Sequence, residues 1–283
     1  MGSTQLEVAG LTLRAVSVGG KETCIEVPAW KLAFDIGRCP PTAVRARQVL
    51  FTHSHIDHMG GVAHHVGLRQ LQGMTPPHYV VPAEHAEGFS ELLGVWRKLD
   101  GSSLPCDVTP VRPGDEVALG GGRSAVVFRA VHRVAAVGYA VVSRRAVLRS
   151  SYVGLSGAML AAARERGDEI TEERLTTELA FCGDTTIDVV DREPLVRQAR
   201  VLVLECTFMG DDPESLRRAT KTGHVHLDQL AERAECFENE AIVLTHFSPR
   251  YPPSQIVRLL DKKLPPGLRE RVVPLLPVAP WSR

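Results

Sequence analysis

Thr52-His53-Ser54-His55-Ile56-Asp57-His58-Met59-Gly60-Gly61 carries four candidate metal ligands within six residues, from His53 to His58. The preceding run, 48–51, is mostly apolar and β-prone, which indicates that the motif follows a buried strand. The two glycines allow a tight turn into a helix. Imidazole nitrogens and a carboxylate suit zinc or a similar divalent ion. A solvated histidine-rich loop is the simpler interpretation, but H-x-H-x-D-H after an apolar strand favours a metal site.

Length and composition are typical of a chain that folds around one large core. Of its 283 residues, 44% are hydrophobic, so we expect a single α/β domain over residues 1–283. The 33 basic and 33 acidic residues balance, which counts mildly against a nucleic-acid substrate. The six cysteines are scattered and include no C-x-x-C pair, which favours buried thiols over a disulfide framework.

The amino terminus has no basic segment followed by an apolar one, as a secretory signal would. No uncharged apolar run in the sequence is long enough to span a bilayer. We therefore expect a cytoplasmic protein that does not partner a membrane.

Three further apolar runs each end in a possible ligand, namely His132, Asp184 and His246. Strand ends are where α/β folds place their chemistry, so these side chains should meet the histidine motif at one edge of a β core. A carboxylate whose two oxygens each bind one cation suits the position between two ions. We expect His53, His55 and His132 at one ion, Asp57, His58 and His246 at the other, and Asp184 as the bridge.

A hydroxide held between two divalent ions is an effective nucleophile at neutral pH, and both ions stabilise charge on the attacked centre. The ligand set therefore predicts a hydrolase. Asp35 closes an earlier strand, over 31–36, and is expected to brace the histidine loop without binding metal. His64 and His65 lack partners at ligand spacing, so we interpret them as surface or packing residues.

Helical periodicity is expected over 59–71, 83–99, 227–237 and 253–264. In the second of these segments, Phe89, Leu92, Leu93 and Trp96 lie on one face, which we expect to pack in the core. Residues 110–119 and 124–131 are expected to pair as strands across three glycines.

Residues 144–178 are an expected excursion from the core, and a helix within it should end near Arg166. A basic cluster, Arg144, Arg145 and Arg149, opens the segment. Arg164 and Arg166 extend the basic character, although a solvated helical face explains these two residues as well.

Several motifs carry a resemblance to known proteins. H-S-H-I-D-H (53–58) with G-D-T (183–185) resembles the metallo-β-lactamase superfamily. L-T-H-F-S-P-R-Y (244–251), G-H-V-H-L-D-Q-L (223–230) and A-F-D-I-G-R-C-P (33–40) are similar to ribonuclease Z, the tRNA 3′-end processing endonuclease, in its short plant-type form. The resemblance implies an αββα sandwich, two zinc ions, a homodimer and precursor tRNA as substrate. Residues 144–178 would then be a short substrate-recruiting arm, with Arg144, Arg145 and Arg149 as candidate tRNA contacts.

The same resemblance implies roles for individual residues. His224, oriented by Glu205, would donate the proton to the departing 3′ oxygen, and Asp57 would complete the catalytic set. Ser248 and Arg250 would hold a phosphate, unless Arg250 forms a structural ion pair. Family members often have Thr or Ser where this chain has His226, so His226 stays open as the proton donor.

Two other functions remain open at this point. A small-molecule phosphodiesterase, thioesterase or lactonase could use the same pair of ions, and the neutral overall charge fits such an enzyme. A catalytically silent RNA-binding or scaffold protein is the third possibility, which the complete ligand set disfavours. Glu205 with His224, together with Ser248 and Arg250, favours phosphodiester chemistry.

Overall fold

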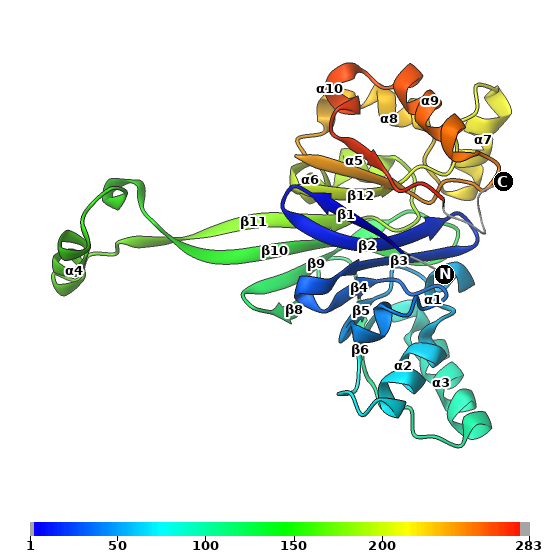
Figure 1. Ribbon diagram of the computed structural model, residues 1–283, viewed down its shortest axis with the longest axis horizontal. Coiled ribbons are helices and arrows are strands. Elements are labelled where there is room, and N and C mark those ends of the chain that lie inside the picture. The colour runs from blue at the N-terminus through cyan, green and yellow to red at the C-terminus, as the bar shows by residue number, and fades with distance from the viewer. Residues whose placement is uncertain (1–2, 278–283) are drawn as a thin grey trace.

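The computed structural model describes residues 3–277, in which two seven-stranded sheets pack face to face. Helices cover their outer faces (Figure 1). The first sheet has the order β1 (Thr4–Val8), β2 (Leu11–Val18), β3 (Glu22–Val27), β4 (Leu32–Phe34), β5 (Gln48–Leu50), β6 (His78–Pro82), β7 (Asp107–Val111). The second has the order β14 (Val272–Pro274), β13 (Ala241–Thr245), β12 (Val201–Glu205), β11 (Thr171–Phe181), β10 (Ala136–Leu148), β9 (Arg123–Ala130), β8 (Glu116–Gly120).

The hydrophobic core forms three layers, as four stacked layers of structure require. Between the sheets, side chains of both inner faces interdigitate; the rings of Phe34 and Phe181, one from each sheet, have centroids 5.2 Å apart. Outside the first sheet pack α2 (Val62–Leu71) and α3 (Ala86–Asp100). Outside the second pack α5 (Asp188–Arg192), α6 (Pro194–Gln198), α8 (Leu227–Glu232), α9 (Pro253–Lys263) and α10 (Pro266–Arg269). This is the αββα sandwich expected of the metallo-β-lactamase fold.

Strands β4 to β7 run parallel, and so do β11 to β14. Parallel strands bring their carboxyl ends to one edge, so the residues that follow β4, β5, β11, β12 and β13 gather there. The expected ligand positions therefore lie on a single rim of the sandwich.

The prediction of one helix over 59–71 is wrong, because the helical segment begins earlier and is interrupted. Instead, α1 (Ile56–Met59) begins within the ligand motif, and α2 starts only after Gly61. A Cβ atom at Gly61 would lie 2.3 Å from the carbonyl oxygen of Ile36, so only glycine allows this approach. Asp57 and His58 are consequently helical, whereas His53 and His55 precede the helix.

Two further expectations need correction. Residues 110–119 are not one strand: β7 ends at Val111 in the first sheet, and β8 begins at Glu116 in the second. The chain crosses between the sheets there, which local alternation cannot reveal. On α3, Phe89 and Leu93 are buried, but Leu92 and Trp96 are each 42% exposed, so half of the expected face is not core.

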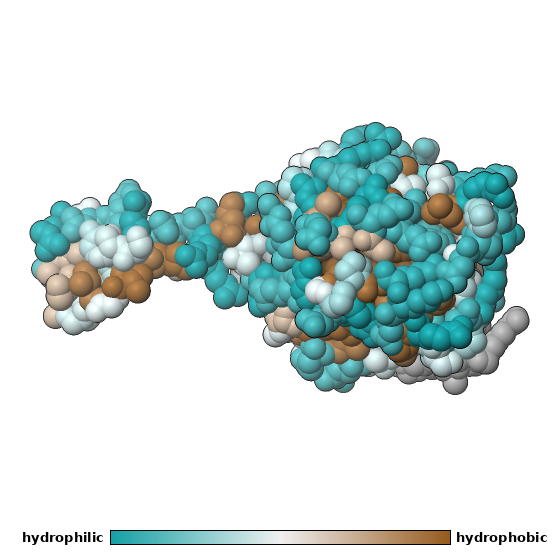
Figure 2. All heavy atoms as spheres, turned by 90° about the horizontal axis from the view of Figure 1, so that it is seen from above, coloured by the Kyte–Doolittle hydropathy of each residue, from teal (hydrophilic) through white to brown (hydrophobic). Residues whose placement is uncertain are grey.

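Strands β10 and β11 continue beyond the body as a two-stranded arm that carries α4 (Gly157–Glu165) at its far end (Figure 1). The expected excursion, 144–178, falls within this arm and its stem. Hydrophobic surface is exposed at the end of the arm and along it (Figure 2). The exposed hydrophobic residues of this segment include Val153, Met159 and Leu175. Within residues 3–277, no helix is long and apolar enough to cross a membrane.

Candidate metal centre

The histidine motif is anchored by Asp35, which follows β4. One carboxylate oxygen of Asp35 accepts the backbone N–H of Thr52 at 2.8 Å. The other accepts the Thr52 hydroxyl at 2.9 Å and His58 Nδ1–H at 2.8 Å. Asp35 is fully buried and its φ is +54°, a conformation unusual for a residue other than glycine. The prediction that Asp35 braces the loop is confirmed.

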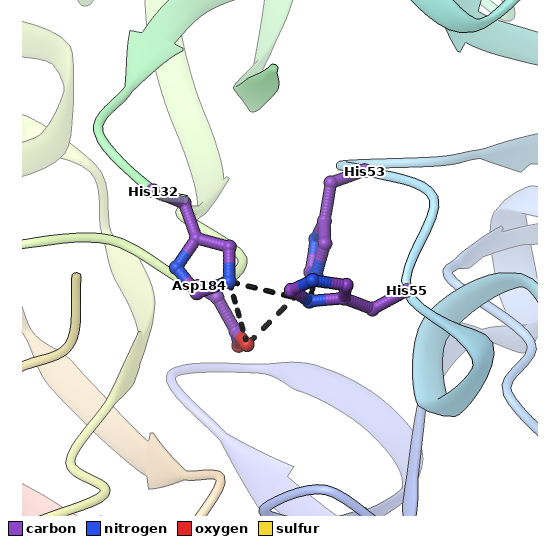
Figure 3. Close-up of side chains that lie close together, drawn as sticks. All are labelled: His53, His55, His132 and Asp184. Carbon is purple, nitrogen blue, oxygen red and sulfur yellow. Dashed lines mark hydrogen bonds and ion pairs between the residues drawn. The ribbon is translucent and has the colours of Figure 1, made fainter. Parts of the chain in front are cut away.

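Three histidines and Asp184 form the first donor group (Figure 3). His55 Nδ1 lies 3.0 Å from His53 Nε2 and 3.3 Å from His132 Nε2. Oδ2 of Asp184 lies 3.8 Å from Nε2 of both His53 and His132. The four donor atoms lie within 4.8 Å of one another, a spacing that permits one cation to bind all of them.

Asp57, His58 and His246 form the second donor group. Oδ2 of Asp57 lies 3.7 Å from His58 Nε2 and 3.5 Å from His246 Nε2. Oδ1 of Asp184 lies 3.4 Å from each of these nitrogens. The two oxygens of Asp184 thus face different groups, as a bridging carboxylate must.

Three buried atoms at the second group have no hydrogen-bond partner among residues 3–277: His58 Nε2, His246 Nε2 and the facing Asp184 Oδ1. Orphaned polar atoms in a protein interior cost free energy unless something satisfies them. Because all three converge, a shared cation accounts for them together, and the donor set fits a divalent metal.

Four histidines direct Nε2 to the centre and use Nδ1 for a bond to the protein behind it. When Nδ1 carries the proton, the lone pair of Nε2 is free for a metal, so these bonds fix the required tautomer. They join His53 to Thr52 Oγ1 (3.0 Å), His58 to Asp35 Oδ2 (2.8 Å), His132 to the Gly223 carbonyl (2.9 Å) and His246 to Thr207 Oγ1 (2.8 Å).

The carboxylates and imidazoles of the centre shift one another's pKa values. Burial alone would raise the pKa of Asp184, but His246 and His58 hold it well below its usual value. Burial alone would lower the pKa of His58, but the carboxylates of Asp184 and Asp35 raise it well above its usual value. The surroundings of His58 thus favour positive charge, which a bound cation can supply without a proton.

Buried Glu205 and half-buried His224 form a hydrogen-bonded pair beside this centre. His224 Nδ1 lies 2.7 Å from Glu205 Oε1, and its ring stacks on His246 with centroids 5.4 Å apart. Burial lowers the pKa of His224, but Glu205, by its charge and hydrogen bond, and then Asp184 raise it to about 9. The other Glu205 oxygen accepts the backbone N–H and hydroxyl of Thr207, at 3.1 and 2.6 Å.

His226, the alternative proton donor, has a different place. Its Nδ1 accepts the backbone N–H of Asp228 at 3.2 Å, which caps the start of α8. Its Nε2 lies 3.0 Å from the carbonyl oxygen of Gly210, and the side chain is fully buried. Both ring nitrogens are therefore engaged away from the metal donors.

The expected substrate contacts lie in varied surroundings. Ser248 is buried and its hydroxyl lies 3.5 Å from the backbone nitrogen of Arg250, whose side chain is exposed. No ion pair of Arg250 is found within residues 3–277, and its role as a phosphate contact stays a prediction. On the arm and its stem, Arg144 pairs with Glu116 (2.6 Å), Arg145 with Glu178 (3.6 Å) and Arg149 with Glu169 (2.8 Å).

Sequence reasoning missed several residues that shape the centre. Thr207 links Glu205 to His246, and its position two residues after the carboxylate was the available signal. A cavity of about 560 Å³ opens beside His132 and is lined by Arg129 and Arg133. These arginines flank a ligand, yet no periodicity distinguishes them from ordinary surface cations.

Comparisons with known proteins agree with this geometry. A model of the beta-lactamase superfamily domain matches residues 36–247. tRNase Z TRZ1 of Arabidopsis thaliana is 39% identical over 272 residues, covering 95% of this chain and 96% of that protein. The chloroplastic tRNase Z TRZ2 of the same plant is 34% identical, covering 95% and 76%.

Solved structures share the fold at lower sequence identity. The metallo-beta-lactamase fold protein YhfI from Bacillus subtilis superposes with a TM-score of 0.60 at 14% identity, covering 91% of this chain and 92% of that one. The short form of human tRNase Z gives 0.53 at 20% identity, covering 88% and 91%.

Proposed function

We propose, from the premise that this chain belongs to the tRNase Z family of the beta-lactamase superfamily, that it is an endonuclease that removes the 3′ trailer from precursor tRNA. The observation that carries the proposal is that two donor groups and the Glu205–His224 pair lie together on one rim of the sandwich. A generic metal-dependent hydrolase needs the donor groups alone, whereas a departing ribose oxygen also needs an acid.

The seven donors are proposed to hold two zinc ions. Imidazole-rich sets with one or two carboxylates suit zinc better than magnesium or calcium, which prefer oxygen ligands. His53, His55 and His132 would bind one ion, Asp57, His58 and His246 the other, and Asp184 both. When bound, the ions supply Lewis-acid activation of water and stabilise negative charge at phosphorus.

His224 is proposed to protonate the 3′ oxygen that leaves. Glu205 fixes the ring through Nδ1, so Nε2 is the atom that can donate to substrate. Thr207 holds the other oxygen of Glu205 and so keeps the carboxylate from rotating. The products would be tRNA with a 3′ hydroxyl and a trailer with a 5′ phosphate.

Substrate phosphates are proposed to bind Arg250, with Ser248 beneath it, and the arginines of the cavity beside His132. Arg144, Arg145 and Arg149 are proposed as arm contacts. The partners of Arg144 and Arg149 are largely exposed carboxylates, whereas Glu178, the partner of Arg145, is buried. Exposed ion pairs contribute little to stability, so exchange of such a carboxylate for a phosphate costs little. The arm would be a recruiting excursion from one metallo-β-lactamase domain.

We further propose that the protein is a cytoplasmic homodimer. Leu71 of α2 and Val95, Trp96 and Leu99 of α3 expose apolar surface, as a subunit interface would. The arm also leaves the body on the side away from α1 (Figure 1), so a second copy would bring an arm nearer each centre. Light scattering with size exclusion should give twice the mass of one chain; a monomer at micromolar concentration contradicts the dimer.

The test is cleavage by zinc-loaded protein of a 3′-extended tRNA, with bis(p-nitrophenyl) phosphate and an acyl thioester in parallel. Removal of the trailer in one endonucleolytic cut supports the proposal. Hydrolysis of the simple diester or thioester without tRNA cleavage rejects it in favour of a small-molecule hydrolase.

A further inference from the structure

A cavity of about 700 Å³ lies at the opposite end of strands β4 and β5 from the metal centre. Lys31 precedes β4 and Arg47 precedes β5, whereas Asp35 and His53 follow those strands. The six residue-to-residue steps from Arg47 to His53 span about 20 Å when extended, so the cavity is separate from the catalytic rim.

The lining is strongly cationic. It contains one carboxylate, that of Glu26, and five positively charged side chains. Within residues 3–277, no carboxylate forms an ion pair with any of these five side chains. Burial raises the pKa of Glu26, but the charge of Arg14 nevertheless acts to lower it. Arg144, Arg145 and Arg149 of the arm and its stem, by contrast, each pair with a glutamate. The five are Arg14, Lys31, Arg45, Arg47 and Arg69.

Arg69 makes the charge imbalance costly. Its side chain is 2% exposed, and its guanidinium donates only to uncharged oxygens, mainly the carbonyls of Val44 (2.6 Å), Ala46 (3.0 Å) and Thr75 (2.8 Å). Its Nε has no hydrogen-bond partner in the described part of the chain. A buried cation without a counter-ion is destabilising, and an anion in the cavity would relieve it.

The remaining walls suit a ligand with an organic part. Pro28, Leu32 and Met74 offer apolar surface, and Thr42 and Thr75 offer polar oxygens. A second cavity, of about 480 Å³, adjoins along Lys31 and Arg47 and is bordered by Trp30. Volumes of this size hold small-molecule ligands.

We propose that this cavity, the cationic pocket, is a second binding site that takes a phosphate group, carried either by a small molecule such as a nucleoside monophosphate or by an RNA strand. Arginine binds phosphate through paired N–H donors, and three of the lining residues are partly or fully exposed arginines able to do so. The site is independent of the nuclease proposal, because no residue of the metal centre lines it.

The experiment compares zinc-loaded wild type with two double variants, each losing two positive charges. Arg45→Gln/Arg47→Gln alters the cationic pocket at exposed side chains, so folding is preserved. Arg258→Gln/Lys262→Gln on α9 is the matched control. Adenosine monophosphate is titrated into each protein by calorimetry at fixed salt, and the KM for 3′-extended tRNA is measured in parallel.

We expect adenosine monophosphate to bind the cationic pocket, a site that does not depend on the metal. Its affinity for that site should fall at least tenfold in the pocket variant and not in the control. An unchanged KM would then assign the site to free phosphorylated molecules. A KM raised severalfold in the pocket variant, but not in the control, would assign it to phosphates of the tRNA. Nucleotide affinity and KM both within twofold of the control overturn the proposal.

Discussion

The two ends of strands β4 and β5 carry opposite electrostatics. At the carboxyl ends, carboxylates and imidazoles converge as metal donors, and a hydrogen bond behind the ring orients four of the imidazoles. At the amino ends, five cations surround a cavity with one carboxylate. The contrast shows that a binding site for ions is recognised by charged groups that lack partners of opposite charge. Ordinary surface charges usually pair with their neighbours.

The sharpest way to break this contrast is Asp184→Ala, which removes the carboxylate shared by both donor groups. Loss of the bridge should release at least one metal equivalent and lower kcat/KM for precursor tRNA by roughly 10³-fold or more. Elemental analysis of the dialysed protein and single-turnover cleavage measure the two effects. Retention of two metal equivalents would show that Asp184 is not the bridge.

His224→Ala should act on catalysis and leave the metals in place. Removal of a general acid lowers kcat by roughly 10²- to 10⁴-fold, while the donor groups are untouched. His226→Asn, which keeps a capping side chain on α8, is the control and should retain most activity. Equal losses in the two variants would contradict the assignment of His224.

The amino-end region can be tested through His65, which is buried with Nδ1 2.8 Å from Tyr79 Oη and Nε2 3.2 Å from the Ala43 carbonyl. Burial, with the positive charge of Arg69, lowers the pKa of His65 to about 4. An imidazole that is neutral when folded but protonates near pH 6.5 when unfolded stabilises the fold above pH 6.5, and this contribution is lost as the pH falls toward 4.

Wild type should therefore lose about 3 kcal/mol more unfolding free energy than His65→Gln between pH 6.5 and pH 4. Urea unfolding across that interval gives both slopes. Because the metal ligands titrate alike in both proteins, the difference isolates His65. Parallel slopes would mean that His65 titrates normally.

The smallest effect is expected from Asp35→Asn. The amide keeps the volume but not the charge that orders Thr52 and His58, so metal affinity should fall about 10- to 100-fold. Competition with a zinc chelator measures it. A change below twofold would show that the backbone alone positions the histidine loop.

The metal centre was predictable because its ligands follow apolar strands at recognisable spacing, and parallel strands must deliver their ends to one edge. Seven donors and the brace Asp35 could be assigned in this way. The start of α1 inside the motif could not, since Asp57 and His58 are consistent with either loop or helix. The role of Thr207 and the cationic pocket could not be predicted, because both depend on residues that are close only in the folded chain. The sequence around Arg69, for example, does not show that its guanidinium lies away from any carboxylate.

The central claim is endonucleolytic cleavage of precursor tRNA by water. It is tested most directly by mapping both product ends from a single-turnover reaction of zinc-loaded protein with 3′-extended tRNA. We predict one cut after the discriminator nucleotide, which leaves a 3′ hydroxyl on the tRNA and a 5′ phosphate on an intact trailer. A 2′,3′-cyclic phosphate, stepwise shortening of the trailer, or no cleavage would contradict it.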